Sequence, residues 1–191
     1  MPRVRVTDDV DALLVSASYS ESAAVEEAVA RLGFRRDMSA THAHRWIAPG
    51  GDQLDLVPFG QHLGASGSAL DHAAAATAIE TQLEPGLSIR HVSAPAFVAM
   101  KLAAHSDRFS DDPFGSRDLQ DVFAVIASRP EIVAEMKSAP IEIRSFSGRE
   151  LKQLLMHPDA EEIVAAHLND ARPLAPVVEW TLERARGMAE S

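Results

Sequence analysis

The sequence contains no cysteine, few aromatic residues and a deficit of positive charge. Without cysteine the chain can form neither a disulfide nor a zinc–thiolate site, and it has no thiolate nucleophile. Aromatic residues make up 5% of the 191 residues, and 18 Lys and Arg stand against 28 Asp and Glu, for a formal net charge of −10. Such a surface does not attract nucleic acid non-specifically, so an RNA or DNA substrate would need a local basic patch or bound cations.

Long apolar runs and a leader-like N-terminus are also missing. No stretch approaches the ~20 apolar residues of a membrane span, and no signal-peptide core is present. We therefore expect a cytoplasmic protein without a membrane partner. With 46% hydrophobic and 24% charged residues, the composition is typical of a globular chain that is long enough for one domain or two small ones.

An acidic stretch before an apolar strand is the most informative feature of the N-terminal half. Arg5-Val6-Thr7-Asp8-Asp9-Val10-Asp11 leads directly into Ala12-Leu13-Leu14-Val15. Side chains alternate along a strand, so Asp9 and Asp11 share one face and repel each other unless a cation lies between them. Hard cations such as Mg²⁺ prefer oxygen ligands of this kind. The alternative is that these acidic residues belong to a turn before the strand, where Asp is common, and bind no ion.

A second strand supplies a third carboxylate. Residues 45–48 and 53–59 are extended runs on either side of Pro49-Gly50-Gly51-Asp52, which predicts a β-hairpin. Asp55 is a lone carboxylate in the apolar second arm, where an unpaired buried charge is costly. If the two strands pair in one sheet, Asp55 joins Asp9 and Asp11, and three such carboxylates can hold two Mg²⁺ ions for phosphoryl or nucleotidyl transfer.

The pattern of the whole chain predicts an α+β fold, with a small mixed β-sheet core in residues 1–92 and a helical domain in residues 93–191. A helix over 21–32, capped by Ser20 or Ser22, ends at Gly33, and residues 60–77 form a loop followed by a short helical or irregular stretch. Further strands are expected within 34–38, 79–83 and 87–92. Helices are expected over 95–104, with Pro95 in the first turn and Ser93 as the cap, and over 117–127, 130–138, 150–156, 160–168 and 176–188, with a polar loop over 107–116.

The histidines have two interpretations. His42 and His44 form a His-x-His pair that can bind a metal or act as a base on a strand. Their context is loop-like and no carboxylate partner is evident, so we expect them, and His105, to be surface residues.

Taken in order, these motifs resemble the polymerase-beta-like nucleotidyltransferase superfamily, and within it the minimal or abortive-infection type, whose members include toxins of type IV toxin–antitoxin pairs. The stretch from Arg5 to Asp11 is similar to that family's Arg-x-Thr-x-Asp-x-Asp signature. The similarity continues to about residue 126 in three further segments: Leu32-Gly33-Phe34, Leu54-Asp55-Leu56-Val57-Pro58-Phe59, and a helical Lys…Asp-Arg…Arg-Asp-x-x-Asp motif at Lys101, Asp107-Arg108 and Arg117-Asp118-Leu119-Gln120-Asp121.

This resemblance implies a small mixed-sheet core and a Mg²⁺-dependent transferase that moves a nucleoside monophosphate from a nucleoside triphosphate to a hydroxyl of an RNA end, a protein or a small molecule. It further implies an antitoxin-like partner. The implied catalytic and metal-binding residues are Asp9, Asp11 and Asp55, with two Mg²⁺ expected. The implied nucleotide-binding residues are Lys101 and Arg108, facing the phosphates, and Asp118 and Asp121, which orient those cations or touch the sugar or base.

A salt-bridge network between two helices is the alternative interpretation of the charged residues in the helical motif, which include Lys101 and Asp118. A third interpretation of the whole chain is a helical scaffold or partner-binding protein whose acidic cluster has no function.

One departure from the family pattern bears on activity. The family carries Gly-Gly or Gly-Ser, whose backbone binds the triphosphate, ahead of the paired aspartates. Here four residues precede Arg5, and Gly50-Gly51 lies downstream in the hairpin turn. We therefore expect either a start further upstream or a truncated, catalytically inactive relative that serves as a binding or regulatory module. A missing first strand would leave a bare sheet edge, and a second copy of the chain could cover that edge to form a homodimer.

Overall fold

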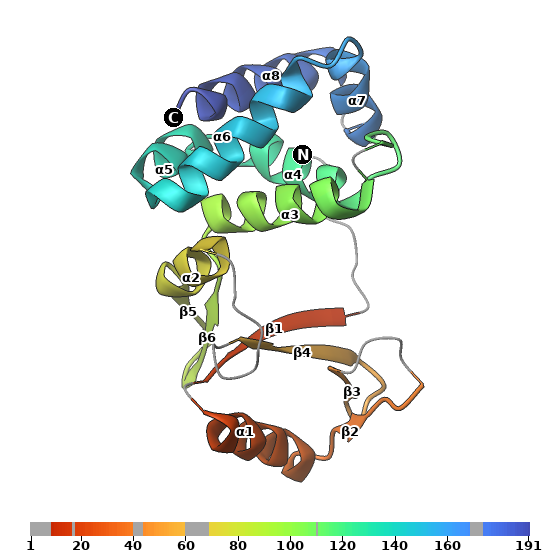
Figure 1. The fold of residues 1–191 in the computed structure, drawn as a ribbon, viewed down its shortest axis with the longest axis vertical. Coiled ribbons are helices and arrows are strands. Elements are labelled where there is room, and N and C mark those ends of the chain that lie inside the picture. Colours follow the sequence, from red (N-terminus) through yellow and green to blue (C-terminus); the bar gives the residue numbers. More distant parts are fainter. Residues whose placement is uncertain (1–8, 17, 40–43, 60–68, 110, 169–173) are drawn as a thin grey trace. The chain divides into compact units, whose positions relative to one another are not determined.

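The computed structural model describes residues 9–16, 18–39, 44–59, 69–109, 111–168 and 174–191 (Figure 1). The chain divides into two compact units: a sheet unit within residues 5–68 and a mainly helical unit over residues 69–191. The predicted division at residues 92 and 93 follows the change to a helical pattern, whereas the compact units divide between residues 68 and 69. Both units together give the predicted α+β architecture.

The sheet unit is built on a mixed sheet. Within the described residues its strands lie in the order β1 (Asp9–Val15), β4 (Gln53–Phe59), β3 (Arg45–Ile47) and β2 (Arg35–Arg36). β1 pairs with β4 in parallel, while β4 with β3 and β3 with β2 are antiparallel. A parallel pair needs a crossover connection, and α1 (Tyr19–Arg31) lies in it. The predicted strand before Val15 and the predicted β-hairpin are confirmed.

One face of this sheet carries the core of the unit. Leu14, Trp46 and Leu56 are buried, and Ala12, Val29, Phe34 and Leu54 pack against them. Because side chains alternate on a strand, Asp9 and Asp11 lie on the opposite face from Ala12 and Leu14.

The ends of α1 show which local signals set the helix. Ser18 caps the start, since its Oγ accepts a hydrogen bond from the Glu21 amide at 3.2 Å, so the predicted caps at Ser20 and Ser22 are wrong. The end is as predicted: Gly33 follows the last turn with φ +89°, a left-handed backbone that disfavours other residues.

The helical unit begins with α2 and a β-hairpin and continues as packed helices. Residues 60–68, part of the predicted loop, lie outside the described residues, and the short helix expected after it is α2. The remaining elements are α2 (Ala69–Ala76), β5 (Ile79–Glu84), β6 (Leu87–His91), α3 (Ala94–Phe109), α4 (Arg117–Ser128), α5 (Ile132–Ser138), α6 (Ile141–Leu155), α7 (Ala160–His167) and α8 (Leu174–Ala189).

The core of the helical unit lies where α3, α4, α6 and α8 meet. α3 packs on α4 and on α6, and α8 packs on α4 and on α6. The predicted apolar face of α4 is confirmed, because Leu119, Val122, Phe123 and Ile126 are fully buried. Other members of this core include Val98, Leu102, Ile132, Met136, Ile143, Leu151, Ile163, Ala185 and Met188.

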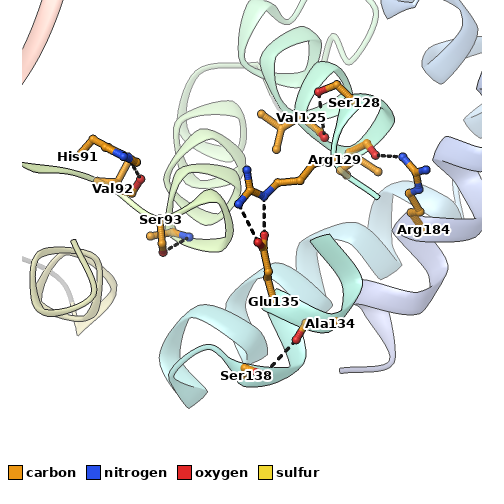
Figure 2. Close-up of polar contacts among 12 residues, drawn as sticks. His91, Val92, Ser93, Val125, Ser128, Arg129, Ala134, Glu135, Ser138 and Arg184 are labelled. Carbon is orange, nitrogen blue, oxygen red and sulfur yellow. Dashed lines mark hydrogen bonds and ion pairs between the residues drawn. The ribbon is translucent and has the colours of Figure 1, made fainter. Parts of the chain in front are cut away.

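Two arginine side chains stabilise the C-terminal end of α4. Arg184 on α8 donates from Nη1 to the carbonyls of Ile126 and Ala127 at 2.8 and 2.7 Å, and thereby satisfies oxygens that the helix leaves unpaired. Arg129, just after α4, forms a bidentate ion pair with Glu135 on α5 at 2.6 and 2.7 Å (Figure 2). These contacts hold the α4–α5 turn against α8.

Two helix boundaries differ from the predictions. α3 runs to Phe109, so Asp107 and Arg108 lie in its last turns and not in a polar loop. α6 begins at Ile141 instead of residue 150. Its first half contains Ile143 and Gly148, which have modest or poor helix propensity, and it is stabilised by packing, since Ile143 is fully buried.

None of the helices in the described part of the chain has the length and apolar character that a membrane crossing requires.

Candidate functional site

The three predicted aspartates lie on one face of the sheet unit. The β1–β4 register pairs Asp11 with Asp55, and Asp9 with Gln53. Residues two apart on a strand, and residues paired across neighbouring strands, point to the same side. Asp9, Asp11 and Asp55 therefore share the face that lies opposite the core of the unit. We call this surface the carboxylate face.

Arg45 on β3 supplies a cation to the carboxylate face. The β3–β4 register pairs Arg45 with Asp55. Its Nε and Nη2 donate to Asp55 Oδ1 and Oδ2 at 2.8 and 2.7 Å, and Nη2 also lies 3.4 Å from Asp9 Oδ2. The two short contacts form the bidentate fork that guanidinium and carboxylate favour.

This ion pair explains why a charged Asp55 is tolerated in an apolar strand. The side chains of Arg45 and Asp55 are 22% and 13% exposed, so both are largely shielded from water. The hydrogen bond that Arg45 donates to Asp55 is the main cause that raises the pKa of Arg45; burial opposes this change, and the charges of Asp55, Asp9 and Asp37 add to it. The guanidinium is thus a permanent positive charge beside these carboxylates.

Reasoning from the sequence missed Arg45. Counted outward from the predicted turn at residues 49–52, residue 48 falls opposite residue 53, and Asp55 then faces Trp46. In the structure the turn is one residue shorter, because the Ala48 amide donates to the Asp52 carbonyl and Ile47 lies opposite Gln53, and this register brings Arg45 opposite Asp55. A cation and a carboxylate directly opposite each other form a stabilising cross-strand pair.

The carboxylate face offers Mg²⁺ suitable donor atoms but not a suitable arrangement. Carboxylate oxygens are the ligands that Mg²⁺ prefers. Both oxygens of Asp55, however, accept hydrogen bonds from Arg45, and the same guanidinium lies beside Asp9. Among the residues that the structure describes, no group of three His, Cys, Asp or Glu side chains is placed to hold a metal ion. The implied two-metal site therefore does not fit this arrangement while Arg45 binds Asp55.

The remaining four predicted site residues form one ion-pair network in the helical unit. Lys101 Nζ on α3 lies 2.8 Å from Asp121 Oδ2 and 3.5 Å from Asp118 Oδ1 on α4. Arg108 Nη2, also on α3, donates to Asp118 Oδ2 at 2.8 Å. Asp118 is 7% exposed and joins the two cations. The structure thus brings these four residues together as a bridge between α3 and α4.

Both interpretations of the network keep some support. The interhelical salt bridges are present, as the structural alternative predicted. Lys101 and Arg108 are nevertheless 26% and 61% exposed, so both cations remain accessible to an anion while paired. Lys101 Nζ also lies 5.6 Å from the centre of the Phe97 ring. Contact with a nucleotide by Lys101, Arg108, Asp118 or Asp121 stays a prediction.

The prediction that His105 lies at the surface is wrong. His105 is 9% exposed, and its Nδ1 lies 3.0 Å from the Oγ of Ser116, which caps α4 by accepting from the Leu119 amide at 3.3 Å. Burial lowers the pKa of His105, and the negative charge of Asp118 opposes that change. Helix α3 is longer than predicted, which carries His105 into the core.

A second histidine that the sequence did not single out has a similar environment. His167, at the end of α7, lies with Nε2 2.8 Å from the carbonyl oxygen of Pro113. Burial lowers the pKa of His167, while the hydrogen bond to Pro113 opposes that change. His44 is exposed, as predicted, and His42 lies outside the described residues.

Two clusters therefore remain as functional candidates, one in each unit. The carboxylate face combines Asp9, Asp11 and Asp55 with Arg45, and the network between α3 and α4 combines two accessible cations with two acids. In comparisons of the sequence with known proteins, no protein-family profile and no curated protein matches this chain.

Proposed function

We propose that the chain is a nucleotidyltransferase-like protein that moves a nucleoside monophosphate from a nucleoside triphosphate to a hydroxyl on RNA, protein or a small molecule. The observation that carries the proposal is the β1–β4 register, which pairs Asp11 with Asp55 and leaves Asp9 on the same face. The order of the sequence motifs that resemble such enzymes supports it further. A nucleoside triphosphate is the proposed substrate, and an antitoxin-like protein is a proposed partner.

The proposed reaction assigns roles to this chain's own residues. The acceptor oxygen would attack the α-phosphorus, the bond to pyrophosphate would break, and the hydroxyl proton would pass to a carboxylate. Asp55 is the proposed proton acceptor because it is shielded and lies beside Asp11 in the sheet, and it would take this role once Arg45 has released its oxygens. Mg²⁺ is the cofactor that the resemblance implies; Asp9, Asp11 and Asp55 would hold it only after Arg45 had released Asp55, and it would then supply positive charge beside the phosphates.

The test is transfer of label from nucleotide to acceptor. The purified chain is incubated with each α-labelled nucleoside triphosphate, Mg²⁺ or Mn²⁺, and a cell extract. We expect label in RNA, protein or a small molecule, and we expect Asp55→Asn to lower transfer at least ~100-fold because it removes the proton acceptor.

The matched control is Asp52→Asn, in the exposed turn of the same hairpin, which we expect to leave transfer unchanged. Absence of transfer with every nucleotide, together with absence of metal binding, would overturn the proposal.

A non-catalytic binding or regulatory module is the second candidate, and Arg45 favours it. Its guanidinium neutralises Asp55 and Asp9 without any bound ion, so the carboxylates have a structural use. This candidate predicts that Asp9→Asn and Asp55→Asn leave every cellular phenotype of the chain unchanged. Loss of a phenotype in either variant, with the fold intact, would reject it.

A further inference from the structure

The misfit between the carboxylate face and a metal site has one identifiable cause. The guanidinium of Arg45 takes both oxygens of Asp55, and its Nη2 extends towards Asp9 Oδ2. A divalent cation bound to Asp55 on this face would lie within a few ångströms of that guanidinium. Two cations at such a distance repel each other strongly in a shielded site.

We propose that Arg45 is the resident cation of the carboxylate face, and that Arg45 and a divalent cation exclude each other on Asp55. This inference rests on the proposed function, because it describes how the same site is kept closed. Metal binding through Asp55 would first require the guanidinium to swing away from the strand pair. Arg45 thus lowers the apparent affinity of the face for divalent ions by the cost of breaking its bidentate contact.

The chemistry of arginine makes this closure insensitive to pH. The charged groups that face Arg45 are Asp9, Asp37 and Asp55, and all of them raise its pKa further. A guanidinium therefore stays protonated throughout the physiological range. Only competition can release it: a divalent cation on the carboxylates, or an anion such as a polyphosphate on the guanidinium, which accepts the same two-pronged hydrogen bond.

The register of the sheet argues that this contact is built in. Arg45 and Asp55 are cross-strand partners on β3 and β4, so the backbone itself holds their side chains opposite each other. The pair does not depend on a chance rotamer of a long surface side chain. Removal of Arg45 should therefore open the carboxylates and leave their positions on the strands unchanged.

The experiment is direct titration of the full chain with Mn²⁺, without nucleotide, followed by the electron paramagnetic resonance signal of free Mn²⁺. We expect Arg45→Gln to bind Mn²⁺ at least ~10-fold more tightly than the unaltered chain, and Arg45→Lys to gain less because an ammonium still neutralises Asp55. The double variant Arg45→Gln with Asp55→Asn should lose the gain, which assigns it to Asp55.

Arg31→Gln is the matched control, since it removes the same charge from an exposed position on α1 of the same unit. Equal Mn²⁺ affinity in Arg45→Gln, Arg31→Gln and the unaltered chain would overturn the inference. Fluorescence of the buried Trp46 checks that the sheet is intact, and Arg45→Lys provides the test if Arg45→Gln does not fold.

The same titration separates this inference from the proposed function. Tighter Mn²⁺ binding by Arg45→Gln, with no nucleotide transfer by any form of the protein, supports the exclusion by Arg45 and counts against the enzyme. Nucleotide transfer by the unaltered chain, with an Mn²⁺ affinity that Arg45→Gln does not change, supports the enzyme and counts against the exclusion by Arg45.

Discussion

The hydroxyl of Ser116 serves two partners at once. Its Oγ accepts a hydrogen bond from the Leu119 amide and lies 3.0 Å from His105 Nδ1. A hydroxyl has one proton to donate and two lone pairs, so Oγ can accept from the amide and still bond Nδ1 in either tautomer of the ring. One side chain thus caps α4 and orients a buried histidine.

We expect Ser116→Ala to lower the free energy of unfolding of the helical unit by about 1–3 kcal/mol. The substitution removes a helix cap and leaves a buried Nδ1 without its partner. Urea denaturation followed by far-UV circular dichroism measures the change. Ser138→Ala is the control, because Ser138 is exposed at the end of α5, and a loss as large as that of Ser116→Ala would refute this double role of Ser116.

At the scale of single residues, the aspartates of the carboxylate face were predictable from the sequence, whereas their partner Arg45 was not. Alternation along a strand is a local rule, so Asp9 and Asp11 could be placed on one face from their spacing alone. Arg45 meets Asp55 through the register of a hairpin, which depends on the exact turn. The burial of His105 depends on a helix that extends further than its sequence pattern predicted.

At the scale of elements, the junction of α3, α4 and α7 is held by two neutral histidines. His105 contacts the cap of α4, and His167 contacts the carbonyl of Pro113 in the connection between α3 and α4. Both side chains lie in surroundings that disfavour a positive charge, and the pKa of each is lowered below its ordinary 6.5. This junction should therefore weaken in acid.

We expect the melting temperature of the helical unit to fall between pH 7.5 and pH 5. Below pH 6.5 the unfolded chain binds protons that the folded histidines do not, so the stability present above pH 6.5 is lost as the pH falls towards the folded pKa values. Glu135, whose pKa Arg129 holds below 4.5, titrates below this window. The measurement is thermal denaturation across this pH range.

Substitutions that mimic the neutral rings are the control for this pH effect. His105→Asn retains an acceptor or donor near Nδ1, and His167→Gln retains a donor near Nε2, while neither side chain titrates. The double variant should show a smaller loss of melting temperature in acid than the unaltered chain. An unchanged loss would show that other groups cause it.

Helices with a strong apolar period were predictable at this scale, and helices stabilised by packing were not. α4 has its apolar residues at helical spacing, and its predicted range of 117–127 matches Arg117–Ser128 closely. The first half of α6 contains poor helix formers, and contact with α3 and α8 stabilises it. Such tertiary support is not visible in the local sequence.

At the scale of the whole molecule, the two units have separate cores of very different size. The core of the sheet unit consists of Leu14, Trp46 and Leu56 with a few partly buried neighbours. The core of the helical unit draws on α2 to α8 and contains more than twenty buried residues among those that the structure describes. Stability scales with buried apolar area, so the sheet unit is the weaker of the two.

We expect the two units to unfold in separate steps, with the sheet unit first. The chain has two tryptophans, Trp46 in the sheet unit and Trp180 on α8, so the variant Trp180→Phe makes fluorescence report on the sheet unit alone. Its urea midpoint should lie at least ~1 M below the midpoint measured by far-UV circular dichroism, which follows the helical unit. Coincident midpoints would show that the units unfold as one.

The topology of the sheet also predicts the order in which its charges meet during folding. Arg45 and Asp55 belong to a local hairpin, whereas Asp11 must find Asp55 across a parallel pairing that spans the whole crossover. Local antiparallel pairs form faster than distant parallel ones. We therefore expect β3 and β4 to join before β1 docks, which folding rates of Trp46→Leu and Leu14→Ala variants can test. In that order Asp9 and Asp11 reach a hairpin in which Arg45 already neutralises Asp55, so folding does not have to bring three bare carboxylates together.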